Sequence, residues 1–416
     1  MTGGLSIMEE AQKKAVPSTV LASLALQRVR ASTCILVNLD AVAHNVKVLR
    51  GLAGQNTGIM GVVKGGAYGS GMLPVVEVLL EEGVEELSVA TVAEGVYLRK
   101  HSIEAPITVL GNLSACEVDD VLKHRLVPTL SWAAPLAARP AHTLVYPDGS
   151  RLSVAINIDT GMSRYGVQPE DLPALVTALD DLNVPIASMY THFQASINEP
   201  EKNKKQLDIF LEATESYKSR PLTRHVAATT GCVQGLGTDL DLIRPGGAIT
   251  GLSSGSDEES AGLFAECGFL PALSVVGRPT FFKQLPPGRG IGYAATYQTS
   301  GHEWIANLAT GWSDGLSRRL SNNGVVKRVK TGDQCPIVGR VSMDSITIRL
   351  PEAPAEDEVF QVISDDFDEH TSAVGLARSL EAAVYEMPGN WSTRLPRVYT
   401  RHSTIAKVCP SLEYTC

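Results

Sequence analysis

The stretch IMGVVKGGAYGSG, residues 59–71, places a lysine at the end of an apolar run. The run has the length and composition of a buried strand, and the glycine-rich turn that follows Lys64 contains Tyr68. Lysine is rarely buried in a protein unless it is paired or takes part in chemistry. We therefore interpret Lys64 as a candidate functional residue.

Similar apolar runs of strand length recur along the chain on both sides of Lys64. They are ILVNLDAV (35–42), LSVAT (87–91), ITVLGN (107–112), VPTLSW (127–132), LSVAINID (152–159), IASMYTHF (186–193), HVAATTG (225–231) and LIRPGGAITG (242–251). Between them lie helical patterns such as LPVVEVLLEEG (73–83), PEDLPALVTALDDL (169–182) and KKQLDIFLEATESY (204–217). Alternating buried strands and helices indicate a parallel sheet, and about eight such units predict an α/β fold of the (β/α)8 barrel type, similar to a TIM barrel.

The composition changes near residue 270, where short β-rich runs are broken by Gly, Pro and Ser. We expect an N-terminal extension at 1–33 that need not be ordered, a barrel at 34–268 and a mostly β C-terminal domain at 269–416. One helical pattern remains in the last domain, SAVGLARSLEAAVYE (372–386).

The chain has 416 residues and a net charge of −9, and its composition suits a globular enzyme with a sizeable core. The negative charge disfavours nucleic acid or an anionic membrane as the main partner, and we predict neither. The seven cysteines lack the spacing of a zinc site or a disulfide framework, so no metal site is expected. A cytoplasmic location is predicted, with organelle import through the N-terminal extension left open.

Polar residues follow several of the predicted barrel strands, where barrel enzymes carry their active sites. A lysine in an apolar pocket is a candidate for Schiff-base formation, because desolvation lowers its pKa. The turn RPGG, residues 244–247, exposes backbone N–H groups that can hold a phosphate. This combination suggests pyridoxal 5'-phosphate (PLP), although Schiff-base chemistry of the aldolase type also fits.

Eight motifs resemble, in order and spacing, those of the alanine racemase family. They are VVKGGAYGSG (62–71), NIDTGMSRYG (157–166), YTHF (190–193), IRPGGAITG (243–251), GYAATY (292–297), GWSDGLSRRLSN (311–322), PIVGRVSMDSITIRLP (336–351) and VYEMPGNWSTRLPRVY (384–399). The resemblance runs from about Cys34 to about Val408. It implies a PLP-dependent isomerase with an N-terminal barrel and a C-terminal β-domain, which interconverts L-alanine and D-alanine and serves D-alanine biosynthesis.

The resemblance also implies roles for individual residues. Lys64 would bind PLP covalently and act as a base on one face of the substrate, and Tyr293 would be the base on the opposite face. In the family this tyrosine comes from the partner subunit, so the active unit would be a homodimer. Contacts to the cofactor would come from Tyr68, His192, Thr229, Arg244, Gly246, Gly247 and Tyr385, with Arg244 at the pyridine nitrogen and His192 supporting it. Contacts to the substrate would come from Arg164, Met343, Asp344 and Trp312.

Two residues depart from the family pattern. Trp312 occupies the position of a tyrosine in the family motif GYxDG, which alters the wall of the substrate path. Asn157 replaces a lysine that often carries a carbamate, and its amide or a bound chloride would have to orient Arg164 instead. These departures leave a racemase of broad or altered specificity, for example for serine, as an alternative. A non-catalytic PLP-binding protein is a second alternative from a different class, although such proteins lack the C-terminal domain.

Overall fold

The computed structural model describes residues 18–367 and 370–410 of the chain. The chain folds into two compact units, one formed by residues 42–270 and the other by residues 1–41 together with 271–416. We refer to them as the barrel unit and the β unit.

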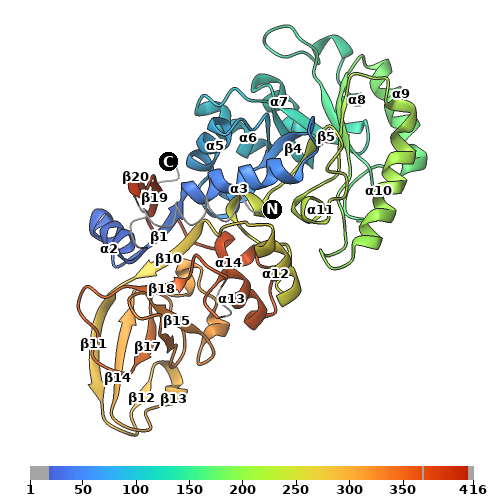
Figure 1. The fold of residues 1–416 in the computed structure, drawn as a ribbon. Coiled ribbons are helices and arrows are strands. Elements are labelled where there is room, and N and C mark those ends of the chain that lie inside the picture. The colour runs from blue at the N-terminus through green and yellow to red at the C-terminus, as the bar shows by residue number, and fades with distance from the viewer. Residues whose placement is uncertain (1–17, 368–369, 411–416) are drawn as a thin grey trace. The chain divides into compact units, whose positions relative to one another are not determined.

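The barrel unit is built around eight parallel strands, paired in the order β8-β7-β6-β5-β4-β3-β2-β9 (Figure 1). The strands are β2 (Gly58–Val62), β3 (Glu86–Val89), β4 (Ile107–Asn112), β5 (Val127–Leu130), β6 (Val154–Asn157), β7 (Ile186–Tyr190), β8 (Thr223–His225) and β9 (Leu242–Ile243). Backbone hydrogen bonds between β8 and the β9 region, from Asp241 N to Arg224 O and from Arg244 N to Ala227 O, bring the two ends of the sheet together. The predicted barrel is confirmed.

Helices follow most of these strands. The α-helices are α3 (Leu39–Leu52), α4 (Lys64–Tyr68), α5 (Met72–Glu81), α6 (Val92–Lys100), α7 (Val118–Lys123), α8 (Ala134–Ala137), α9 (Leu172–Asp181), α10 (Pro200–Thr214), α11 (Thr229–Gln234) and α12 (Glu258–Glu266). Local sequence explains several helix starts. Thr91 and Glu94 form a reciprocal capping box at α6, and Asp257 caps α12 through the backbone N–H of Ser260.

The β unit contains a seven-stranded sheet in the order β16-β15-β18-β10-β1-β19-β20. Its strands are β1 (Thr33–Asn38), β10 (Leu273–Gly277), β15 (Val325–Arg328), β16 (Gln334–Pro336), β18 (Phe360–Ile363), β19 (Arg397–Arg401) and β20 (Thr404–Cys409). Strand β1 pairs antiparallel with β10 and parallel with β19. The predicted barrel start at residue 34 is therefore wrong, because the first apolar run completes this sheet instead.

Part of the predicted N-terminal extension is a helix of the β unit, α2 (Ser18–Val29). Ala22, Ala25 and Leu26 are buried and pack in one cluster with Cys34, Leu36, Val276 and Val398 from the sheet. Burial of this apolar face stabilises the helix. The rest of the predicted extension, residues 1–17, lies outside the described residues.

The β unit also holds a three-stranded sheet, β11-β14-β17, and a two-stranded ribbon, β12-β13. Their strands are β11 (Pro279–Leu285), β14 (Glu303–Leu308), β17 (Ile346–Leu350), β12 (Gly290–Ile291) and β13 (Tyr297–Gln298). The predicted helix at 372–386 is split into α13 (Ala373–Leu380) and α14 (Glu386–Gly389). Glu381 ends α13 in the left-handed conformation, with φ of 52°.

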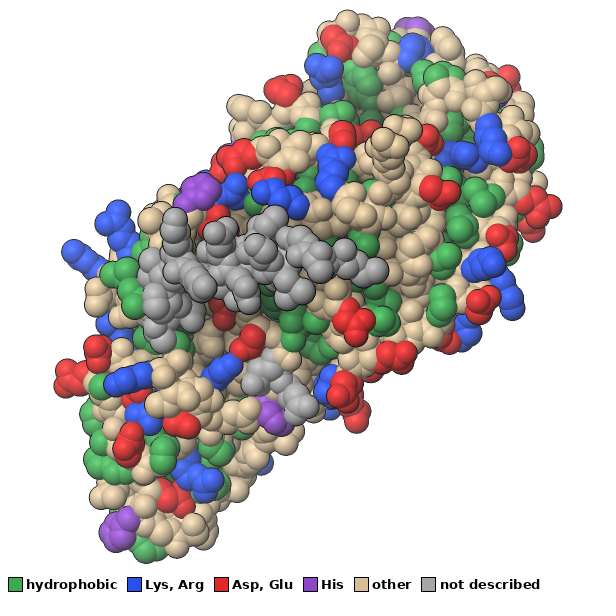
Figure 2. Space-filling view, viewed as in Figure 1, with side chains coloured by type: hydrophobic (Ala, Val, Ile, Leu, Met, Phe, Trp, Pro, Cys, Tyr) green, Lys and Arg blue, Asp and Glu red, His purple; other side chains and the backbone are tan. Residues whose placement is uncertain are grey.

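Charges of both signs are interspersed over the face shown in Figure 2. In the part of the chain that the structure describes, no helix has both the length and the apolar composition to span a membrane, and no cluster of His, Cys, Asp and Glu could hold a metal ion. Cys34, Cys116, Cys232, Cys267 and Cys335 are free thiols, whereas Cys409 is disulfide-bonded.

Candidate active site

Lys64 lies two residues beyond β2, at the C-terminal end of the strand, as the first residue of α4. The four residues after it, Gly65 to Tyr68, all have positive φ between 53° and 63°, so the chain makes a left-handed turn. Glycine adopts this conformation freely, whereas Ala67 and Tyr68 adopt it at an energetic cost. Backbone bonds from Ala67 N to Val63 O and from Gly69 N to Gly65 O hold the turn. Strain of this kind is common at functional sites.

The amine of Lys64 is half-buried and forms no hydrogen bond or ion pair with any described residue. Burial lowers its pKa, and the positive charges of Arg164 and Arg244 lower it further. The Glu94 carboxylate acts in the opposite direction, while its Oε1 accepts a 2.6 Å hydrogen bond from Gly65 N. Lys64 is thus more readily deprotonated than an ordinary lysine, which suits a base or a nucleophile.

Arg244 follows β9 and is only 2% exposed. Its guanidinium lies 2.6 Å from His225 Nδ1, donates to Thr191 O at 2.8 Å and lies 4.9 Å from the centre of the Tyr190 ring. Among the described residues it forms no ion pair with a carboxylate. A buried guanidinium without a counter-ion is costly, so a ligand atom that accepts a hydrogen bond at this place would be stabilised.

Two histidines contact Arg244, and both are held neutral. Burial, followed by the charges of Arg244, Arg164 and Lys64, lowers the pKa of His192 to about 3. Burial and Arg244 hold the pKa of His225 well below its ordinary value. His225 Nδ1 is the shorter contact, since His192 Nδ1 lies 3.4 Å from the guanidinium. The predicted supporting residue His192 thus lies within hydrogen-bond distance of Arg244, and His225 is a second and closer neighbour.

The Thr229 hydroxyl and the backbone N–H groups of the turn after Arg244 lie close together. Thr229 Oγ1 accepts hydrogen bonds from Gly246 N at 3.3 Å and Ala248 N at 3.1 Å, so its own proton remains for another acceptor. Thr229 does not cap α11, which has no side-chain cap. A side chain at Gly246 would place its Cβ 2.1 Å from the Tyr68 hydroxyl, so glycine is required for Tyr68 to lie there. Burial raises the pKa of Tyr68 to about 12, and it remains a neutral phenol.

Arg164 and Asn157 come from the same strand–loop segment. Asn157 is the buried last residue of β6. Arg164 is exposed in the following loop, with its guanidinium 5.7 Å from the centre of the Tyr165 ring. The positive charge of Arg164 lowers the pKa of both Lys64 and His192. Arg164 therefore lies close enough to both side chains to affect their protonation.

The remaining predicted site residues lie in the β unit, where two loops are bound together. Trp312 N donates to Ser342 O, and Ser313 donates to Met343 O through both its backbone N–H and its hydroxyl. Gly311 is packed so closely that an added Cβ would lie 2.2 Å from Met343 O. The loop that carries Trp312 and the loop that carries Met343 and Asp344 therefore form one rigid pair.

A buried carboxylate and an arginine reinforce this pair of loops. Asp314 accepts a 2.7 Å hydrogen bond from Gly311 N, and Arg394 bridges Asp314 and Asp344 at 2.8 and 2.7 Å. Trp312 and Met343 remain 46% and 48% exposed.

Tyr293 is the most exposed large hydrophobic side chain of the described residues, at 68%. It lies in a short 3-10 turn between β12 and β13, next to Gly292 with φ of 68° and Ala294 with φ of 59°. Tyr385 is the half-buried residue that precedes α14. The strained turn holds Tyr293 away from the core of its unit.

Two contributors to the site were missed in the sequence. Glu94 belongs to a capping box, a pattern that predicts a helix start but not that its second oxygen reaches the turn after Lys64. His225 is the first residue of the apolar run HVAATTG. The polar residues at the end of this run are the only feature of the sequence that indicates a functional role for His225.

Comparison with known proteins identifies the family. The sequence profile described as "Alanine racemase, N-terminal domain" matches residues 37–254, and "Alanine racemase, C-terminal domain" matches residues 272–399. The chain belongs to the alanine racemase family. The family resemblance of the eight motifs is thereby confirmed.

Relatives and solved structures agree with this assignment over nearly the whole chain. The alanine racemase of Halothermothrix orenii is 32% identical, covering 90% of this chain and 98% of the relative. That of Geobacillus stearothermophilus is 33% identical, covering 89% and 94%. A crystal structure of the Bacillus anthracis alanine racemase with bound L-Ala-P has a TM-score of 0.82 and 30% identity, covering 92% of this chain and 98% of the other. The alternatives of a broad-specificity racemase and a non-catalytic PLP-binding protein are not favoured by these relatives.

Proposed function

We propose that this protein is a PLP-dependent alanine racemase that interconverts L-alanine and D-alanine. One observation carries the proposal: a half-buried lysine of lowered pKa lies in the same strand-end group as a buried arginine that has no carboxylate partner. A ligand of these two residues must offer a hydrogen-bond acceptor to the guanidinium and a reaction partner to the amine, and PLP supplies a pyridine nitrogen and an aldehyde. The names of the relatives agree with this activity.

The described residues fit this cofactor. Lys64 would bind its aldehyde carbon covalently, while Tyr68, Thr229 and the backbone at Gly246 and Gly247 would hold the phosphate. Thr229 has a proton free for an acceptor, and the absence of a side chain at Gly246 allows the Tyr68 hydroxyl to lie against the same turn. Tyr385 of the β unit would contribute a further phosphate contact.

Arg244 would lie against the pyridine nitrogen, held by His225 and with His192 beside it. A guanidinium does not readily give up a proton to a ring nitrogen. Bound PLP withdraws electrons from the substrate Cα, and an arginine at the ring limits how far that charge spreads. This limit favours simple proton exchange over transamination.

Racemisation requires removal of the Cα proton from one face and delivery of a proton to the other. Lys64, with its lowered pKa, would take or give the proton on one face, and the Tyr293 hydroxyl would act on the opposite face. Arg164 and the Met343 backbone would hold the substrate carboxylate, with Asp344 fixing the loop through Arg394. Trp312 would form part of the wall along which the substrate enters.

We further propose a homodimer in which Tyr293 acts on the partner subunit. Three exposed apolar side chains of the β unit, Tyr293, Trp312 and Met343, would be covered by this contact. A cytoplasmic location stays a prediction.

The test is turnover of the PLP-loaded protein in deuterated water with L-alanine, L-serine and a longer L-amino acid. Chiral chromatography with mass detection would follow both the D-enantiomer and deuterium at Cα. We expect D-alanine to form fastest and to carry deuterium. Faster turnover of another substrate would contradict alanine as the substrate, and no exchange with any of them would contradict the racemase.

A further inference from the structure

The Glu94 carboxylate joins the ends of two neighbouring barrel strands. Its Oε2 accepts hydrogen bonds from Ala90 N at 2.8 Å and Thr91 N at 3.1 Å, where β3 ends and α6 begins. Its Oε1 accepts from Gly65 N at 2.6 Å, in the turn that follows β2. A capping box requires contacts at its own helix start alone. The bond to Gly65 is therefore additional, and it links α6 to the residue after Lys64.

Gly65 is the point at which the chain enters the left-handed turn. Its φ is 61°, and the next three residues also have positive φ. The first N–H groups of a helical turn have no acceptor within that turn, so the one at Gly65 needs an acceptor from elsewhere. Gly65 N is bonded to the carbonyl carbon of Lys64, and the two residues share one planar peptide unit. The bond from Glu94 thus restrains the backbone from which the Lys64 side chain projects.

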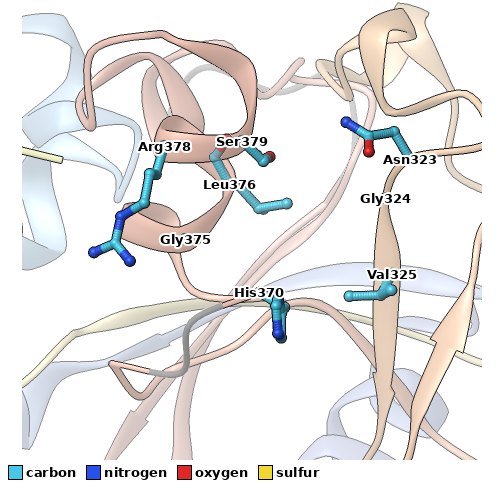
Figure 3. A pocket seen from close by; sticks show the side chains of 8 residues that line it. All are labelled: Asn323, Gly324, Val325, His370, Gly375, Leu376, Arg378 and Ser379. Carbon is cyan, nitrogen blue, oxygen red and sulfur yellow. Dashed lines mark hydrogen bonds between the residues drawn. The ribbon is translucent and has the colours of Figure 1, made fainter. Parts of the chain in front are cut away.

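Other helix starts show what capping alone requires. Glu117 Oε2 accepts a hydrogen bond from Ser114 N at 3.0 Å, in the 3-10 turn that precedes α7. At α13, Ser372 Oγ accepts from Gly375 N at 3.0 Å, and Gly375 lies beside a pocket of about 240 Å³ in the β unit (Figure 3). Both bonds stay within the local helix start. The reach of Glu94 to a different strand end is thus not needed to begin a helix.

The amine of Lys64 lies among ionisable groups from several elements of the barrel unit. They are Glu94 on α6, Arg164 in the loop after β6, His192 after β7, Arg244 after β9 and Tyr68 in the turn itself. Burial moves the pKa of the histidine to about 3 and that of the tyrosine to about 12, so both are uncharged. Burial also lowers the pKa of Lys64; the two arginines lower it further, and the Glu94 carboxylate raises it. Glu94 supplies the negative charge in a group that is otherwise positive.

We propose that Glu94 is a positioning residue for Lys64: its carboxylate fixes the turn on which the amine stands and opposes the charge of the two arginines. The proposal rests on the function proposed for Lys64, whose amine must reach a ligand and exchange a proton. A base that binds a proton too weakly removes one from carbon inefficiently. With Glu94, the amine is deprotonated more readily than an ordinary lysine and still binds a proton strongly enough to act as a base.

The first measurement tests the charge, on the full chain without PLP. Acetylation with acetic anhydride at a series of pH values, followed by peptide mapping with mass detection, gives the pH profile of each lysine. Glu94→Gln keeps an oxygen acceptor and removes the charge, so we expect it to shift the Lys64 profile to lower pH. Glu117→Gln, the matched loss of a capping carboxylate, should leave that profile unchanged. Lys47, a surface lysine paired with Glu82, is the internal reference.

The second measurement tests the turn, by hydrogen exchange of the same full chain. In Glu94→Ala the peptide that contains Gly65 should exchange about tenfold faster than in the wild type, because its N–H group loses a charged acceptor. Glu94→Gln should change this rate much less, since the amide oxygen can still accept. Glu117→Ala should leave exchange at Gly65 unchanged. Neither measurement requires cofactor or turnover.

A third measurement connects both effects to the reaction. With PLP bound and L-alanine as substrate, Glu94→Ala should lower kcat about tenfold and change KM by less than about twofold. A wild type without turnover would contradict the racemase, whereas the labelling and exchange results would still decide the role of Glu94. An unshifted Lys64 profile in Glu94→Gln would overturn the proposal. So would unchanged exchange at Gly65 in Glu94→Ala, because Glu94 would then serve the start of α6 alone.

Discussion

The two units hold their site residues in opposite ways. In the barrel unit, Arg244 is buried among His225, Thr191 and Tyr190, and Lys64 stands on a turn fixed by backbone bonds. In the β unit, Tyr293 is mostly exposed on a strained turn. The barrel unit thus fixes Lys64 and Arg244 with its own contacts, whereas the β unit leaves Tyr293 exposed. This difference is what the proposed homodimer explains.

The largest expected effect is that of Lys64→Ala. The variant should lose racemisation by about 10³-fold or more, because the proposed mechanism would lose both its covalent attachment to PLP and one of its two bases. Its absorbance spectrum should also lack bound PLP after dialysis. Lys47→Ala, which removes a surface lysine paired with Glu82, is the control and should retain activity and spectrum. A Lys64→Ala protein with near-normal turnover would contradict the assignment.

Tyr293→Phe should lower turnover by about 10²- to 10³-fold while PLP binding is kept, because the hydroxyl is exposed and contributes little to folding. Tyr297→Phe on the same ribbon is the matched control. Tyr297 donates to Glu303 at 2.7 Å, so its loss should lower thermal stability with little effect on turnover. Steady-state kinetics and thermal melts separate the two. The reverse pattern would show that the wrong tyrosine has been chosen.

Asp314→Ala tests the clamp that holds the Trp312 and Met343 loops. It should destabilise the protein by about 2–3 kcal/mol, because Gly311 N and Arg394 lose a buried charged acceptor. The free energy of unfolding from urea titration measures this. A change below about 0.5 kcal/mol would mean that the loops are held by their backbone bonds alone.

The histidines of the barrel unit predict an acid dependence of stability. The pKa of His192 is lowered in the folded state to about 3, so the unfolded chain binds its proton more readily. His192 therefore contributes stability that is present above pH 6.5 and lost as the pH falls toward 3. In urea titrations at pH 7 and pH 4, His192→Gln should lose less stability on acidification than the wild type. Equal losses would contradict the lowered pKa.

Trp312→Tyr should have the smallest effect. It restores the family's residue on an exposed loop whose backbone bonds remain. We expect KM for alanine to change only a few-fold and kcat less, since in the proposed mechanism the side chain borders the substrate path and does not transfer a proton. A change of 10²-fold or more in kcat would assign Trp312 a part in the reaction itself.

The barrel could be predicted from the sequence because its strands are continuous apolar runs separated by helical patterns. The start of the barrel could not be predicted from the sequence, because β1 has the same apolar character as a barrel strand. Its partners β10 and β19 are more than 230 residues away in the chain, and only the folded structure reveals this pairing.

The candidate site shows the same limit. The eight motifs located Lys64, Arg244 and Tyr293 by type and order. The contact of a second histidine, His225, with Arg244 could not be predicted, because it depends on how the ends of β7 and β8 are placed in the fold. The second contact of Glu94, to the turn after Lys64, is likewise a tertiary one.

The most direct test of the central claim is complementation between two inactive variants. Lys64→Ala and Tyr293→Phe subunits, purified separately, would be unfolded and refolded together in equal amounts with PLP. If Tyr293 acts on the partner subunit, half of the random dimers are mixed and each mixed dimer has one intact site. Racemisation should then recover to about one quarter of that of the wild type treated in the same way. No recovery, although mixed dimers form, would show that Lys64 and Tyr293 act within one chain and would contradict the account.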